Sequence, residues 1–296
     1  MCPLVVFSGV NHHNQTIVFA TALVANENEK TYIWLLQQFL DAMKGKAPGC
    51  GITDGHGAMK KKCMLFDYEV SEFEDHWHYM VEALGLSDNQ WISDLYSRRR
   101  MWATAHIRGN FFWNFRTTLR CEGLHSMLGK FVQSCHNLRD FVEQFMRCIS
   151  QMRSRKAHFD LLSVVGEPVL QSPFHDLERS ATRKLTRAIF FNFRPMLFRA
   201  CTLKVRTHTW SQTFDTFTLS RSGNARREWQ VCHYGDSNSF KCSCLRMESF
   251  GILCDHIVAV LKYLEMTNIL DSLVLDRWSK SAHSKVRTFV EKGPFC

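Results

Sequence analysis

The sequence has no uninterrupted apolar run long enough to cross a membrane. None of its stretches reaches the about 18 apolar residues that a membrane-spanning helix needs. Its first residues, Met1 to Phe7, lack the basic lead of a secretory signal peptide. The 12 cysteines therefore point to a reducing compartment, where thiols stay free or hold a metal. These absences argue against a membrane protein and a disulfide-rich secreted domain, and we expect no membrane partner.

Internal repeats and low-complexity tracts are also absent. The 296 residues are 45% hydrophobic and 12% aromatic, which allows a sizeable core and two domains and argues against a disordered chain. The formal net charge of +9 favours polyanionic partners, but solvated Lys and Arg faces explain this charge equally well.

The most specific pattern consists of two closely spaced pairs of metal-ligating residues. Cys242 and Cys244 form a C-x-C pair, and Cys254 and His256 form a C-x-H pair after nine intervening residues. Zinc prefers four tetrahedral ligands of thiolate sulfur and imidazole nitrogen, in pairs that a short chain folds together. We therefore expect one zinc ion on these four residues. The site is expected to be structural because protein groups fill all four positions.

The residues around these pairs predict two strands and a helix. Strands are expected over 228–234 and 239–241, with a turn at 235–238, and a helix is expected from Asp255. Ordinary buried cysteines are the alternative, but the paired spacing within these elements disfavours it. The pattern over 228–265 resembles a SWIM zinc finger.

The first third of the chain predicts a hairpin, a helix and a further strand. Strands are expected over 4–10 and 16–24, and an amphipathic helix over 31–43 that lies against them. A short strand over 50–53 ends at Asp54, and Glu122 follows on a distant helix. This order is typical of an RNase-H-like fold, in which carboxylates hold two Mg²⁺ ions for phosphoryl transfer.

Helices dominate the middle of the chain. The segment 71–116 is rich in Trp and Phe, and strong periodicity predicts helices over 138–153 and 174–198. Two prolines, Pro168 and Pro173, indicate a boundary between these helices, and residues 207–219 are β-rich.

Two further groups of reactive residues carry weaker hypotheses. His76 and His78, next to Asp75, could hold a second metal, but histidines on an aromatic helix are more often packed or exposed. Cys121 and His125 have the spacing of a nucleophile and a base on one helix face, but no third orienting group is visible.

Four stretches together resemble the Mutator-type transposase domain of the plant far-red-impaired-response family. They are 9–15, the helix over 31–43, 52–54 and 117–122. The finger also stands where that family carries its own, so the resemblance extends from residue 1 to about 265. It implies a transposase-derived transcription factor of the nucleus, with an N-terminal zinc-dependent DNA-binding domain ahead of these parts.

The chain departs from the family pattern in three ways. We expect that the N-terminal DNA-binding domain is absent, that the strand with the first acidic residue would precede Pro3, and that the Cys-x-x-His element is missing after Asp54. Asp54 matches the second acidic position and Glu122 the third. Capping of a helix by Asp54 and solvation of Glu122 are their simpler roles. We therefore expect a truncated or alternatively spliced member whose two carboxylates are vestigial, with no enzymatic activity and no small-molecule substrate.

These predictions give one domain plan within a mixed α/β fold. We expect a truncated RNase-H-like domain with a helical insertion over 1–165, a helical linker over 166–200, a β-rich segment with a small ββα zinc finger over 201–270, and a tail over 271–296. The expected function is a zinc-binding nuclear transcription regulator that acts through protein or DNA contacts. An active DDE-type transposase fragment and an interaction-only fragment that dimerises with full-length relatives are the alternatives. Expected partners are family members and, weakly and without sequence preference, DNA.

Overall fold

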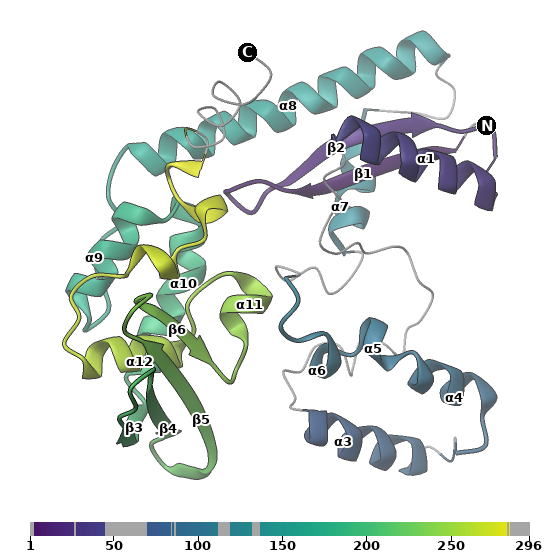
Figure 1. Cartoon of the computed structure of the whole chain (residues 1–296). Helices are drawn as coiled ribbons and strands as arrows, with labels where there is room; N and C mark the ends of the chain where they lie inside the picture. Colours follow the sequence, from purple (N-terminus) through teal and green to yellow (C-terminus); the bar gives the residue numbers. More distant parts are fainter. Residues whose placement is uncertain are drawn as a thin grey trace. The chain divides into compact units, whose positions relative to one another are not determined.

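The computed structural model describes residues 3–26, 28–44, 70–83, 85, 87–111, 119–131, 137–282 and 284. They form a mixed α/β structure of small antiparallel sheets and many helices (Figure 1), which confirms the mixed α/β part of the predicted fold class. The chain has two compact units, which are described separately below. The first combines Met1–Pro48, Leu119–Cys244 and Ile252–Cys296, and the second combines Gly49–Thr118 and Leu245–Gly251. The strand predicted over 50–53 and Asp54 lie outside the described residues.

The predicted N-terminal hairpin is confirmed. Strand β1 (Leu4–Val10) pairs antiparallel with β2 (Thr16–Leu23). Its turn is built by Asn11, whose side-chain oxygen accepts the backbone N–H groups of His13 (2.9 Å) and Gln15 (3.0 Å). Asn14 adopts the left-handed conformation (φ 59°) that asparagine tolerates in turns. The polar turn cluster of the sequence thus fixes a rigid hairpin tip.

Helix α1 (Glu29–Ala42) confirms the predicted helix but begins two residues before the predicted start at Thr31. Asn28 caps the helix by accepting the N–H of Thr31 (2.8 Å). Leu35 is buried, and the ring of Phe39 stacks on that of Phe7 in the hairpin at 4.4 Å. The predicted apolar face is wrong in part, because Tyr32 and Leu36 are exposed.

Helices α7 (Leu119–Gly129) and α8 (Leu138–Val164) pack against the hairpin. Leu124, Leu128 and Cys148 form a buried cluster, against which β1 and β2 place partly buried residues. Helix α8 begins at the predicted residue but runs to Val164 rather than ending at Arg153.

The helix predicted over 174–198 is two helices. The first is α9 (His175–Lys184), and the second is α10 (Arg187–Ala200). Leu185, which follows α9, has an extended backbone and forms a β-bridge with Ser279. Ile189, Phe190, Phe193 and Leu197 of α10 are fully buried. Helix α10 is therefore a core element of the first unit.

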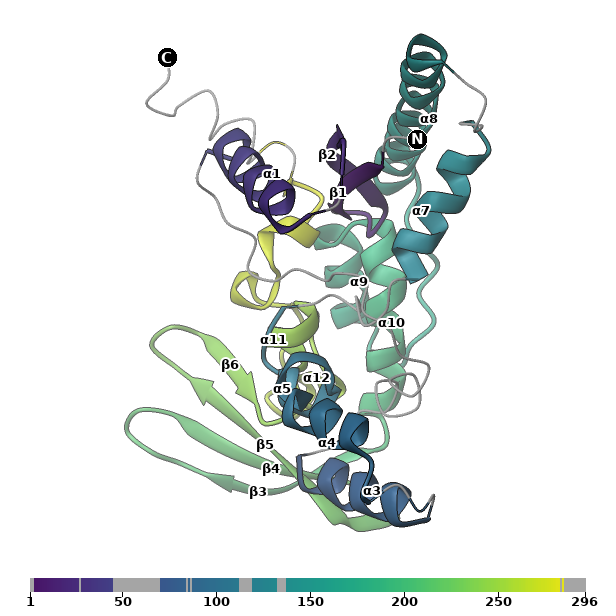
Figure 2. The ribbon, with the colours of Figure 1, turned by 90° about the vertical axis from the view of Figure 1, so that its right-hand side faces the viewer.

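A four-stranded antiparallel sheet follows α10, with the strands in chain order (Figure 2). Its strands are β3 (Leu203–Thr209), β4 (Asp215–Arg221), β5 (Asn224–Tyr234) and β6 (Ser239–Cys242). The β-rich run that was predicted over 207–219 is thus parts of two strands joined by a turn. Helix α12 (Asp255–Tyr263) packs against this sheet and against α10, and two 3-10 turns, Asp271–Leu273 and Asp276–Trp278, complete the unit.

The described residues of the second unit are mostly helical, as its Trp and Phe content predicts. It contains α3 (Val70–Ala83), α4 (Gln90–Ser97), α5 (Arg99–Trp102), α6 (Thr104–Ile107) and the distant helix α11 (Arg246–Phe250). The aromatic core includes Phe73, Trp77 and Trp102. Among the described helices, none has the length and apolar character needed to cross a membrane.

Candidate metal centre

The first ligand pair sits where β6 ends. Cys242 is the last residue of β6, and β5 holds the chain just beyond it. Ser243 donates its backbone N–H to the carbonyl of Gln230 (2.9 Å), and Gln230 donates its own N–H to Ser243 Oγ (3.1 Å). These two bonds extend the strand pairing by one residue, so the positions of Cys242 and Cys244 are set by the sheet.

The second pair lies at the start of α12. Cys254 is the N-cap residue, and its Sγ accepts the backbone N–H of Ile257 at 3.4 Å. His256 stands in the first helical turn, as predicted. The N-terminus of a helix favours negative charge, and this favours a metal-bound thiolate at Cys254.

The fold brings the four predicted ligands together. Their ligating atoms, three Sγ and one imidazole nitrogen, all lie within 4.8 Å of one another. Cys242, Cys254 and His256 are buried, and Cys244 is half-buried. The ring of Trp229 on β5 stacks on His256 at 4.4 Å and fixes the orientation of the imidazole.

The three thiols and the buried imidazole of this cluster favour a bound cation. Hydrogen bonds from Cys242 and Cys254, together with the nearby imidazole, lower the pKa of the Cys244 thiol. Burial raises the pKa of Cys254. Both ring nitrogens of His256 are buried without a hydrogen-bond partner, which is costly unless a ligand satisfies one of them. A Zn²⁺ ion on the four residues would satisfy the imidazole and stabilise all three thiolates, so the donor set fits zinc.

The residues of the predicted acidic pair have different outcomes. Glu122 lies on α7 with its side chain exposed, and Asp54 is outside the described residues. Glu122 belongs to no group of three or more metal-ligating side chains in the part of the chain that the structure describes. His76 and His78 on α3 are exposed and form no such group there either. The side chain of Cys121 is not among those described.

One group of metal-ligating residues escaped the sequence analysis. His12 and His13 at the hairpin tip meet Asp160 of α8, and their ligating atoms also lie within 4.8 Å of one another. Burial lowers the pKa of both imidazoles. Burial by itself would raise the pKa of Asp160, but hydrogen bonds from Lys156 and the two histidines lower it below its usual range. The adjacent histidines were visible in the sequence, but nothing there pairs them with a residue so far along the chain.

Comparison with protein families matches one segment near each end of the chain. The MULE transposase domain matches residues 1–67, and the SWIM zinc finger matches residues 236–265. The chain therefore resembles the class of proteins that join a MULE transposase domain to a SWIM zinc finger. The prediction of one zinc cofactor is confirmed, since the finger contains a cluster that can bind one zinc ion.

Within this class, the relatives over nearly the whole chain are plant far-red-response proteins. FAR1-RELATED SEQUENCE 5 of Arabidopsis thaliana is 26% identical over 96% of this chain and 41% of its own length. FAR1-RELATED SEQUENCE 9 is 24% identical over 99% and 61%, and FAR-RED IMPAIRED RESPONSE 1 is 24% identical over 96% and 39%, both from the same plant. The resemblance to the far-red-impaired-response family is confirmed. The chain spans about two to three fifths of the length of these relatives, and no solved structure matches it.

Proposed function

We propose that the chain is a nuclear transcription regulator derived from a transposase, and that it acts through protein and DNA contacts rather than catalysis. The observation that carries this proposal is the closed zinc cluster. Protein side chains supply four ligands, which leaves no open position for a substrate or an activated water. The zinc therefore holds a surface in shape, and the same chain matches a MULE transposase domain and a SWIM zinc finger. We also propose that the MULE domain has an RNase-H-like core.

The regulatory function can be tested by tethering the chain to a reporter promoter through a heterologous DNA-binding domain in plant cells. We expect nuclear accumulation and a several-fold change in transcription. Cys254→Ser should abolish the change because it removes a buried zinc ligand. Cys232→Ser is the matched control, since Cys232 lies on β5 outside the cluster and is only partly buried. A reporter that does not respond to the wild-type chain would refute the proposal.

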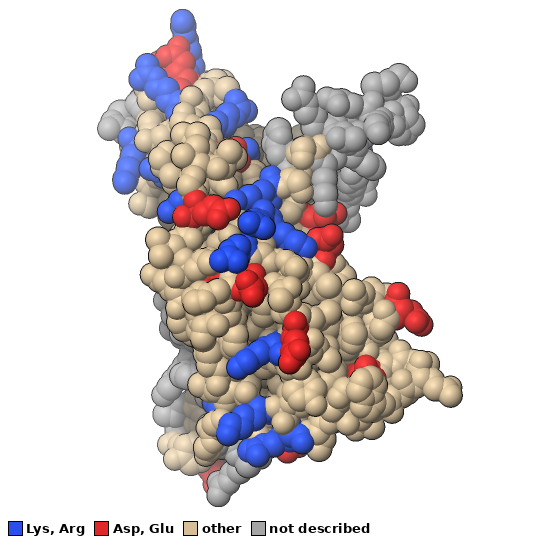
Figure 3. Space-filling model, turned by 90° about the vertical axis from the view of Figure 1, so that its left-hand side faces the viewer, with Lys and Arg blue, Asp and Glu red and all other residues tan. Residues whose placement is uncertain are grey.

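Binding to DNA should be weak and independent of sequence. The basic clusters at 98–100 and 153–156 are partly neutralised within the fold, since Arg99 contacts Glu74 (3.0 Å) and Lys156 contacts Asp160 (2.6 Å). Figure 3 shows acidic residues interspersed among the Lys and Arg residues of one face. We therefore expect dissociation constants of about 10⁻⁴–10⁻⁶ M at physiological salt. The affinity should fall steeply as the salt concentration rises. Fluorescence anisotropy with unrelated duplexes would measure this, and nanomolar binding to one sequence would contradict it.

The chain should also fail to cleave DNA. Two-metal phosphoryl transfer needs ions about 3.5–4 Å apart held by several carboxylates, and a lone Mg²⁺ on one or two carboxylates keeps most of its waters. With Mg²⁺ or Mn²⁺ and DNA carrying terminal inverted repeats, we expect no product above background. Glu122→Ala, and the double variant that also carries Asp54→Ala, should likewise give no cleavage product above background. Cleavage by the wild type that the double variant loses would favour the transposase alternative.

Association with family members is the second part of the proposal. In this proposal the sheet and helices serve as a scaffold by which the chain pairs with itself or with longer relatives. Light scattering on the purified chain, alone and mixed with a far-red-response relative, would detect such dimers. Monomers at micromolar concentration in both samples would remove this part of the proposal.

A further inference from the structure

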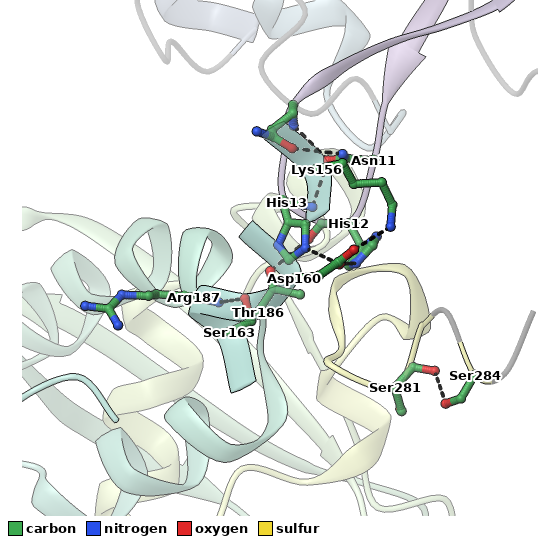
Figure 4. Close-up of polar contacts among 11 residues, drawn as sticks. Asn11, His12, His13, Lys156, Asp160, Ser163, Thr186, Arg187, Ser281 and Ser284 are labelled. Atoms are coloured by element: carbon green, nitrogen blue, oxygen red, sulfur yellow. Dashed lines mark hydrogen bonds and ion pairs between the residues drawn. The ribbon is translucent and has the colours of Figure 1, made fainter. Parts of the chain in front are cut away.

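The tip of the β1–β2 hairpin and helix α8 place two imidazoles and one carboxylate at a single point. Figure 4 shows His12 and His13 directed at Asp160. Nε2 of His12 lies 2.9 Å from Asp160 Oδ1, and Nε2 of His13 lies 2.7 Å from the same oxygen. We propose that these three residues form a second metal site, for a divalent transition-metal ion such as Zn²⁺.

The ligand types and their spacing suit such an ion. Two imidazoles and a carboxylate are a common donor set for zinc and for other first-row transition metals. Tetrahedral zinc with bonds of about 2.0–2.2 Å separates its ligand atoms by roughly 3.3 Å. The two N–O separations, 2.9 and 2.7 Å, are slightly shorter, so each imidazole needs to move from the carboxylate oxygen by only about half an ångström to admit the ion.

The surroundings hold the three ligands in place. Asn11 fixes the turn that carries both histidines, and Thr186 Oγ1 donates to the carbonyl of His12 (2.8 Å). The side chain of His13 is 1% exposed and that of His12 13% exposed, so both rings are packed in defined orientations. A preorganised set of this kind loses little entropy when it binds a metal.

Lys156 completes the arrangement from the next turn of α8. Its Nζ lies 2.6 Å from Asp160 Oδ2, the oxygen that the histidines do not use. Ligating carboxylates are generally hydrogen-bonded in this way through their second oxygen. Lys156 therefore leaves Oδ1 to the metal and makes Asp160 a monodentate ligand.

The site differs from the SWIM cluster in its open position. Protein supplies three ligands here, and the Asp160 side chain is 40% exposed, so a water or a small anion can reach the fourth position. The ion would fasten the hairpin to α8 across a separation of almost 150 residues in sequence. This proposal is independent of the regulatory function, because it rests on a different part of the chain.

A cobalt titration of the full chain tests the proposal. Co²⁺ in the SWIM cluster gives thiolate charge-transfer bands, whereas Co²⁺ on imidazole and carboxylate gives only weaker d–d bands. We expect the charge-transfer bands to saturate at one equivalent and the d–d bands to keep growing to a second. Zinc measured by mass spectrometry after desalting should correspondingly approach two ions per chain.

Two variants and a control assign the second ion. His13→Asn and Asp160→Asn should each lower the stoichiometry from two to one while leaving the charge-transfer bands unchanged. The matched control is His158→Asn, an exposed histidine of α8 outside the group, which should keep two. Circular dichroism would show whether each variant is folded. One ion in the wild type, or a second ion that persists in both folded variants, would overturn the proposal.

Discussion

Removal of zinc should unfold β5, β6 and α12. Structural zinc contributes on the order of 10 kcal/mol of apparent binding free energy in small finger domains, comparable to the whole stability of a typical domain. The four ligands connect β6 to α12, and Ile257, Val260 and Leu261 of that helix are fully buried. Without the metal, three thiols and an unpartnered imidazole would remain in this core.

Hydrogen exchange with and without a strong chelator measures this effect. We expect loss of protection in peptides from β5, β6 and α12, and the same loss in Cys254→Ser. Cys232→Ser should exchange like the wild type. The expectation fails if protein purified without chelator carries no zinc, or if Cys254→Ser folds and keeps its metal.

Truncation of Glu178 should produce the second-largest loss of stability. This carboxylate on α9 is fully buried and accepts the backbone N–H groups of Gln171 (2.9 Å) and Ser172 (2.7 Å). Arg194 Nε lies 3.0 Å from its other oxygen, as an ion pair without a well-aligned hydrogen bond. Removal of one partner from a buried pair typically costs about 3–5 kcal/mol. We expect that range for Glu178→Ala in urea unfolding followed by tryptophan fluorescence.

The control for this variant lies on the same helix. Asp176→Ala breaks a pair with Arg179 in which both side chains are about half exposed, so its cost should be below about 1 kcal/mol. Equal unfolding midpoints for the two variants would contradict the importance of the buried pair.

The same carboxylate should make stability depend on pH. Burial alone would raise the pKa of Glu178, but the hydrogen bonds from Ser172 and Gln171 and the charge of Arg194 lower it below its ordinary 4.5. The folded state therefore binds the proton more weakly than the unfolded state. Its contribution is fully present above pH 4.5 and is lost as the pH falls below that value. Glu178→Gln should flatten this part of the acid unfolding profile.

Local patterns predicted local structure well. The ligand pairs at 242–244 and 254–256 predicted the finger because spacing, turn residues and helix start all lie within a short stretch. The Asn11 turn and the hairpin followed from β-branched residues on either side of a polar cluster. In each case the interactions that form the element join residues that are near in sequence.

Long-range packing was the part that sequence could not supply. Periodicity shows that α10 has an apolar face, but it does not show that this face packs against α12. The turn between β3 and β4 was missed because Trp210 and Phe214 flank it and extend the apolar pattern across it. The prediction for α8 ends too early, at Arg153, because the apolar stripe weakens there. The residues beyond it nevertheless favour helix.

The burial of α12 makes the finger depend on neighbouring elements outside the zinc ligands. Ile257, Val258, Val260 and Leu261 are all fully buried, so α12 is enclosed by α10 and the sheet instead of presenting one wet face. A fragment holding only residues 236–265 would keep the zinc ligands but lose α10 and β3–β5, which cover this helix. Its apolar side chains would then face water, so the metal alone would not reproduce the packing that the finger has in this chain.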